Sequence, residues 1–150
     1  MAGISSSADW RLEAAAKVAA SYQTSRGARA MLVGGSVGRG YPDRWSDLEL
    51  GTFWRNLPQD DDLAEVAERA GGRDRRGWAY DAREHAAAEE FWLGGPAGQG
   101  LLVELQHQSL ADAAALLDEL LGNTNPEPYS LQCAGGRGRC ASHQPRRSWL

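Results

Sequence analysis

Three segments of the chain repeat apolar residues at the spacing of one helix face. The first, residues 6–22, opens with a Ser-x-x-Asp capping box and repeats its apolar face every four positions, at Trp10, Ala14, Val18 and Tyr22. The second, residues 58–70, begins with a proline and three acids and ends at a glycine pair. The third, residues 109–121, begins with a second capping box, and we expect one apolar face to point inward, formed by Leu110, Ala114, Leu117 and Leu121.

Other segments have the length and pattern of strands. Residues 28–33 are short and apolar and stop at a glycine pair, which predicts a buried strand. Residues 46–54 alternate, with Leu48 and Leu50 on one face and Asp47 and Glu49 on the other. Residues 90–93 and 101–107 flank a glycine-rich segment and predict a hairpin, whereas residues 73–88 are polar and are assigned no element. The predicted order is helix, strand, strand, helix, hairpin, helix.

Composition narrows the fold class and the class of partner. The 150 residues suit one domain, and alanine and leucine far outnumber the β-branched valine and isoleucine, which argues against an all-β sandwich. Residues 1–130 hold all 20 acids against 12 basic groups, a net charge of −8. A body this acidic repels a nucleic acid backbone, so we expect no nucleic acid partner.

The two ends of the chain predict its location and its domain boundary. No apolar run is long enough for a membrane helix and the start lacks a signal peptide, so we expect a cytoplasmic protein without membrane contact. Residues 131–150 hold four arginines and no acid. We therefore predict a domain at 1–125 and an atypical Gly/Arg-rich tail at 126–150 that is disordered.

One glycine-rich turn, residues 34–40, carries the candidate chemistry. A Walker-type phosphate loop needs Lys after its last glycine, and a dinucleotide fingerprint needs a small residue at position 43, so both fail. The nucleophile-elbow pattern G-x-S-x-G fits at residues 34–38, but Pro42 stands where a sustained helix should follow Ser36. A serine hydrolase therefore remains a remote alternative.

Three carboxylates provide a further interpretation of this turn. Asp47 and Glu49 share one strand face eleven and thirteen residues after Ser36, and Glu104 lies in an otherwise apolar strand. A lone carboxylate there is costly to bury, whereas a divalent cation beside it stabilises its charge. The pattern favours Mg²⁺-dependent phosphoryl or nucleotidyl transfer.

The same residues resemble the signature of a known superfamily. The run Gly35-Ser36-x-x-Arg39-Gly40, followed after five residues by Ser46-Asp47-Leu48-Glu49-Leu50, resembles the DNA polymerase β-like nucleotidyltransferases, chiefly their antibiotic and minimal branches. The resemblance implies an α/β (α+β) fold, with a small mixed sheet flanked by helices. It also implies that Gly35, Ser36 and Arg39 contact NTP phosphates, and that the metal ligands and catalytic carboxylates are Asp47, Glu49 and Glu104.

The resemblance implies an enzyme that moves a nucleoside monophosphate, expected to be AMP, from an NTP such as ATP to a hydroxyl. We expect a small-molecule, aminoglycoside-like acceptor, and hence a role in antibiotic resistance. The alternatives are a minimal nucleotidyltransferase antitoxin with a helical protein partner, and an inactive remnant whose tail is out of frame. A homodimer is also expected if a second domain is missing. His107 lacks metal-ligand spacing, and we expect it to be structural or exposed.

Overall fold

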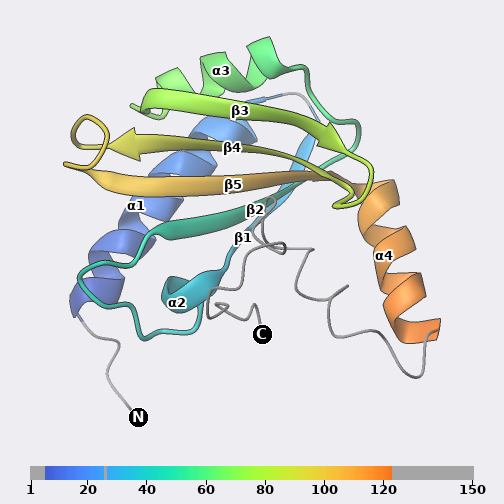
Figure 1. The fold of residues 1–150 in the computed structure, drawn as a ribbon, viewed down its shortest axis with the longest axis horizontal. Coiled ribbons are helices and arrows are strands. Elements are labelled where there is room, and N and C mark those ends of the chain that lie inside the picture. Colours follow the sequence, from blue (N-terminus) through green and yellow to red (C-terminus); the bar gives the residue numbers. More distant parts are fainter. Residues whose placement is uncertain (1–5, 26, 123–150) are drawn as a thin grey trace.

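The computed structural model describes residues 6–25 and 27–122 of the chain (Figure 1). Its elements, in chain order, are α1 (Ser6–Gln23), β1 (Ala28–Val33), α2 (Gly35–Gly38), β2 (Leu48–Trp54), α3 (Asp60–Arg69), β3 (Arg73–Asp81), β4 (Ala86–Leu93), β5 (Leu101–Ser109) and α4 (Leu110–Gly122). The predicted boundary at residue 125 and the tail at 126–150 lie outside the described residues. Among the helices that are described, none is both long and apolar enough to cross a membrane.

The strands form one five-stranded mixed sheet in the order β1-β2-β5-β4-β3. β1 pairs with β2, β4 with β5 and β3 with β4, all antiparallel. β2 and β5 are parallel. Nearly fifty residues separate the two strands in the chain, because α3, β3 and β4 lie between them. The predicted α/β class with a small mixed sheet flanked by helices is confirmed.

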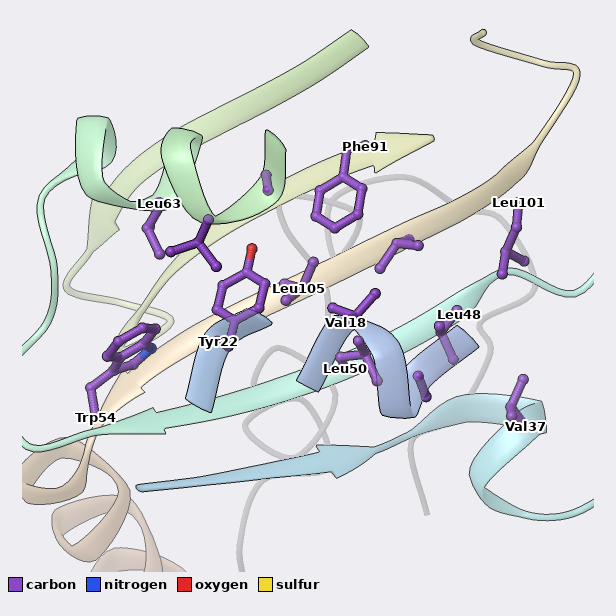
Figure 2. Packing of buried hydrophobic residues seen from close by; sticks show 14 residues of the cluster. Val18, Tyr22, Val37, Leu48, Leu50, Trp54, Leu63, Phe91, Leu101 and Leu105 are labelled. Atoms are coloured by element: carbon purple, nitrogen blue, oxygen red, sulfur yellow. The ribbon is translucent and has the colours of Figure 1, made fainter. Parts of the chain in front are cut away.

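The core lies on the sheet face that α1 and α3 cover. Side chains alternate along a strand, so Leu48, Leu50 and Trp54 of β2 all point to this face, and each is buried. Figure 2 shows Val18 and Tyr22 of α1 reaching into the same cluster, beside Leu63 of α3. The opposite alternation places Asp47 and Glu49 on the other face, as the sequence pattern predicts.

The buried stripe of α1 differs by one position from the predicted face. Val18 and Tyr22 are buried as expected, but Trp10 is 46% exposed and the stripe continues through Ala15 and Arg11. Positions 11, 15, 18 and 22 follow the helical spacing as well as the predicted set does. The sequence pattern favoured position 10 over position 11 because tryptophan is more apolar than arginine.

Strand β1 is half exposed rather than buried. It forms one edge of the sheet, and Leu32 is 60% exposed. An edge strand has a neighbour on one side only, so its apolar composition does not guarantee burial. The predicted burial of this strand is therefore wrong, although its predicted bounds are correct.

The apolar face of α4 does not point inward among the described residues. Ala114 is exposed, and Leu110, Leu117 and Leu121 are 46%, 57% and 82% exposed. The helix begins as predicted, because the Ser109 hydroxyl accepts the Asp112 N–H and donates to the Asp112 carboxylate, at 3.0 and 2.7 Å. Periodicity thus identified the helix and its apolar face, but not what covers that face.

Strand β3 is an element that the sequence pattern missed. It occupies the second edge of the sheet, and eight of its nine residues are exposed. Its side chains are mostly polar because few of them enter the core. The hairpin of β4 and β5 is confirmed, with Leu93 paired to Leu101, and it begins at Ala86 rather than at residue 90.

Candidate functional site

Three predicted carboxylates meet on the sheet face opposite the core. The parallel register of β2 and β5 sets Glu49 directly beside Glu104. Asp47 precedes Glu49 by two residues and shares its face of the sheet. One carboxylate oxygen from each of the three lies within 4.8 Å of the others. The structure therefore brings together the three acids that the sequence singled out.

The glycine turn after β1 lies against Glu49. The Gly34 N–H donates to the Glu49 carbonyl oxygen at 2.8 Å. Gly35 has a φ of +59°, and a Cβ atom there would lie 1.6 Å from Glu49 Oε2. Only glycine permits both this backbone conformation and this close approach. The turn and the carboxylates consequently form one site.

Ser36 and Arg39 follow in the short helix α2 and at its end. Ser36 is partly buried, and its carbonyl oxygen accepts the Tyr41 N–H at 3.1 Å. Arg39 is exposed, and its guanidinium carbon lies 5.3 Å from the centre of the Tyr41 ring. Because α2 has four residues, the turn lacks the sustained helix that a serine-hydrolase elbow requires.

Arg11 of α1 is a site neighbour that the sequence analysis missed. It is 3% exposed, and its Nε donates to the Ser46 carbonyl oxygen, one residue before Asp47, at 3.0 Å. Burial lowers the pKa of Arg11, while the nearby charges of Asp43 and Asp47 act to raise it. The signal was present in the sequence, since position 11 continues the buried stripe of α1.

A second row of charges extends the acidic cluster across the sheet. Glu90 of β4 pairs in register with Glu104, and Arg76 of β3 pairs with Glu90. Arg76 Nη1 lies 3.7 Å from Glu90 Oε1, and Arg76 is largely exposed. Four charged residues from four strands, Glu49 included, thus lie side by side on the face opposite the core.

On the core face, a separate polar network surrounds Glu89. His107 Nε2 lies 2.9 Å from Glu89 Oε1, Arg75 Nε lies 2.6 Å from Glu89 Oε2, and the Tyr22 hydroxyl also donates to Glu89. Trp54 Nε1 donates to His107 Nδ1 at 3.1 Å. An indole nitrogen is only a donor, so the proton of the neutral imidazole lies on Nε2 and points to Glu89. His107 is fully buried and structural, one of its two predicted states.

This network sets the protonation state of Glu89. Burial acts to raise the pKa of Glu89, but the hydrogen bonds from His107, Tyr22 and Arg75 outweigh it, and the pKa is lowered. Burial and the charge of Glu89 raise the pKa of Tyr22. The carboxylate therefore remains ionised in the core, and its partners join α1 to β3, β4 and β5.

The acidic cluster has the donor set of a magnesium site. Mg²⁺ prefers carboxylate oxygens at roughly 2.0–2.1 Å, so two oxygens on one ion lie at most about 4.2 Å apart. One carboxylate oxygen from each of Asp47, Glu49 and Glu104 lies within 4.8 Å of the other two, so a small side-chain rotation is enough to bring all three within this limit. Without a cation the three like charges repel one another. The residues present thus fit a divalent metal.

Comparisons with known proteins support the fold. No family model matches the chain, and no curated protein matches it. A mutant of Cid1 poly(U) polymerase bound to MgATP aligns with a TM-score of 0.50 and 20% identity, over 69% of this chain and 33% of that chain. Cid1 with its short product ApU aligns at a TM-score of 0.47 and 16% identity, over 76% and 35%. Small alarmone synthetase 1 from Bacillus subtilis, bound to its product pppGpp, aligns at 0.38 and 14%, over 83% and 78%.

The chain spans about a third of the length of the Cid1 chains that it matches. The first of these likenesses, at a TM-score of 0.50, is the one that supports a shared fold. Cid1 is a member of the DNA polymerase β-like nucleotidyltransferases. The chain therefore shares its fold with the aligned part of Cid1, and this mixed α/β architecture agrees with the nucleotidyltransferase-like fold that the resemblance in its sequence implies.

Proposed function

We propose that this protein is a Mg²⁺-dependent nucleotidyltransferase that moves AMP from ATP to a hydroxyl group: the hydroxyl oxygen bonds to the α-phosphorus, pyrophosphate leaves, and the hydroxyl proton is released. The observation that carries the proposal is the meeting of Asp47, Glu49 and Glu104 beside the turn at Gly35. Carboxylates at this spacing suit divalent cations, and cations are the usual means of neutralising a transferring phosphoryl group. The shared fold with Cid1, which was solved with MgATP, agrees with this proposal.

Each site residue has a role in the proposed reaction. Asp47, Glu49 and Glu104 would hold the metal, which when bound neutralises charge on phosphate oxygens. The backbone N–H groups at Gly35 and the Ser36 hydroxyl would bind the terminal phosphates of the NTP. Arg39, exposed at the end of α2, would reach the same phosphates from solvent. Glu104 would alternatively accept the proton of the acceptor hydroxyl.

The proposed acceptor is a small cationic molecule with a free hydroxyl, such as an aminoglycoside-like compound. The acidic row continues past the cluster to Glu90, and residues 1–130 carry a net charge of −8. A negative surface raises the local concentration of a cationic acceptor and repels nucleic acid. A role in antibiotic resistance in the cytoplasm would follow from such an acceptor.

A second candidate is a minimal nucleotidyltransferase antitoxin that acts on a helical protein partner. The exposed leucines of α4, at positions 110, 117 and 121, favour it, because an apolar helix face of this kind suits a protein contact. In this case the acceptor hydroxyl belongs to a side chain of the partner. An inactive remnant would instead bind metal and NTP and transfer nothing.

Transfer of labelled AMP from ATP to a panel of small hydroxyl compounds, with Mg²⁺, tests the proposal. We expect Asp47→Asn to lower the rate by roughly 100-fold or more, because one metal ligand is worth several kcal/mol in the transition state. Asp61→Asn is the matched control, since Asp61 is an exposed acid on α3. An Asp47→Asn protein with the full transfer rate would exclude this mechanism.

A further inference from the structure

Arg11 is a buried arginine that the proposed chemistry does not use. It lies on α1, in the stripe that packs against the core, and 3% of it is exposed. A buried guanidinium is costly unless its donors are satisfied. Its guanidinium carbon lies 4.3 Å from the centre of the Trp10 ring, and its Nε donates to the Ser46 carbonyl oxygen at 3.0 Å. The contact joins the first helix to the residue that precedes Asp47.

The segment that Arg11 contacts is held by its own hydrogen bonds. The Ser46 hydroxyl accepts the Asp43 N–H and donates to Asp43 Oδ1, both at 2.9 Å. The Trp45 N–H donates to the same carboxylate oxygen at 2.9 Å. Residues 43–46 therefore form a closed turn, and Arg11 anchors the end of that turn to α1.

The position of Asp47 depends on this turn. Asp47 directly precedes Leu48, the first residue of β2, so it lies at the end of the ladder between β2 and β5. The hydrogen bond from Arg11 holds the Ser46–Asp47 peptide at this strand end. A metal ligand at a strand end gains from such a support, because carboxylates bind best when their orientation is fixed in advance.

We propose that Arg11 is a positioning residue that orients Asp47 for metal binding by fixing the Ser46–Asp47 peptide. The inference rests on the proposed function, since it assigns a support to the same metal site. Arg11 contacts neither metal nor nucleotide in this role. Its charge alone would act in the opposite direction, because a cation beside Asp47 weakens the binding of another cation. Positioning by Arg11 should therefore lower the Kd for the metal, whereas its charge should raise that Kd.

Mn²⁺ affinity of the full chain, measured by electron paramagnetic resonance, tests this role. We expect Arg11→Met to raise the Kd for Mn²⁺ by roughly 10-fold or more, the usual cost of losing a residue that orients a metal ligand. Arg11→Lys, which keeps the charge and a donor for the Ser46 carbonyl, should restore most of the affinity. Arg44→Met is the control, because Arg44 lies exposed in the same turn over the Trp45 ring.

Ser46→Ala keeps Arg11 but removes the hydroxyl that closes the turn at residues 43–46. This variant tests the same role if Arg11→Met does not fold. It should raise the Kd for Mn²⁺ in the same direction, by a few-fold. An unchanged or lower Kd in folded Arg11→Met, or no recovery in Arg11→Lys, would overturn the positioning role. Asp47→Asn separates the two proposals. If both Asp47→Asn and Arg11→Met bind Mn²⁺ as tightly as the wild type, the proposed metal site is wrong. If Asp47→Asn loses binding and Arg11→Met does not, only the proposed role of Arg11 is wrong.

Discussion

At the scale of single residues, the site depends on how closely a backbone atom and a carboxylate approach each other. Gly35 has a φ of +59° and leaves no room for a Cβ beside Glu49 Oε2. Gly40 has a φ of +82°, but apart from its own residue and its two chain neighbours no heavy atom lies within 4 Å of the position that its Cβ would occupy. The two glycines therefore share a conformational requirement and differ in their contact with the site.

This difference predicts different effects of two alanine substitutions. Gly35→Ala and Gly40→Ala should each lower the free energy of unfolding by about 1–2 kcal/mol, because both force a non-glycine residue into left-handed backbone. Only Gly35→Ala should also weaken Mn²⁺ binding, since its new methyl group displaces Glu49. Denaturant unfolding and Mn²⁺ titration measure the two quantities. Equal Kd values in the two variants would contradict the close-approach interpretation.

At the scale of elements, the buried network around Glu89 joins the first helix to the sheet. Glu89 of β4 is bonded to Tyr22 of α1, Arg75 of β3 and His107 of β5. Trp54 of β2 completes it through His107. A network of this kind specifies how elements pack, because a buried charge requires hydrogen-bonding partners at fixed positions around it.

Glu89→Gln should therefore change both the size and the pH dependence of stability. The folded pKa of Glu89 is lowered from its ordinary value of 4.5, so its contribution is complete above that value. The contribution is lost as the pH falls from there through the folded pKa. We expect the free energy of unfolding of the variant to be about 3 kcal/mol lower at pH 7, because Arg75 is left without its buried partner. We also expect this free energy to fall less steeply in the variant than in the wild type as the pH is lowered.

Unfolding by denaturant between pH 7 and pH 3 measures both effects. Glu90→Gln is the matched control, because Glu90 is the next residue and its partner Arg76 is largely exposed. At 3.7 Å and with one partner in solvent, this pair should contribute at most about 1 kcal/mol. Parallel pH curves for the wild type and Glu89→Gln would show that the carboxylate does not contribute as inferred.

At the scale of the whole molecule, one sheet separates two environments. One face carries the apolar core under α1 and α3 (Figures 1 and 2). The other face carries the acidic row from Glu49 to Glu90. Glu104 lies between Glu49 and Glu90 in the register, so like charges flank it on both sides. The folded state therefore carries electrostatic repulsion that a divalent cation would relieve.

Thermal unfolding with and without Mg²⁺ should reveal this repulsion. Without metal, Glu104→Gln should melt at or above the temperature of the wild type, because it removes the central charge. With Mg²⁺ at 100 times its Kd, the wild type should gain about 2.7 kcal/mol, and the variant much less. Glu65→Gln, an exposed acid of α3, should behave as the wild type in both conditions. Equal metal-induced shifts for wild type and Glu104→Gln would contradict a metal site at this position.

The sequence by itself determined the features whose causes are local. Capping residues and apolar spacing predicted three helices, and alternation placed Asp47 and Glu49 on the face opposite Leu48 and Leu50. The spacing from Gly35 to these acids identified the candidate chemistry. All of these depend on residues within about fifteen positions of one another, where backbone geometry relates sequence directly to space.

Tertiary structure alone decided the rest. Glu104 meets Glu49, 55 positions earlier in the chain, only because β2 and β5 pair in parallel, and Arg11 reaches Ser46 from another element. The edge positions of β1 and β3 and the exposed face of α4 also lay beyond the sequence pattern. The physical reason is that periodicity records which face of an element is apolar, whereas the partner of each face is chosen by packing between distant segments.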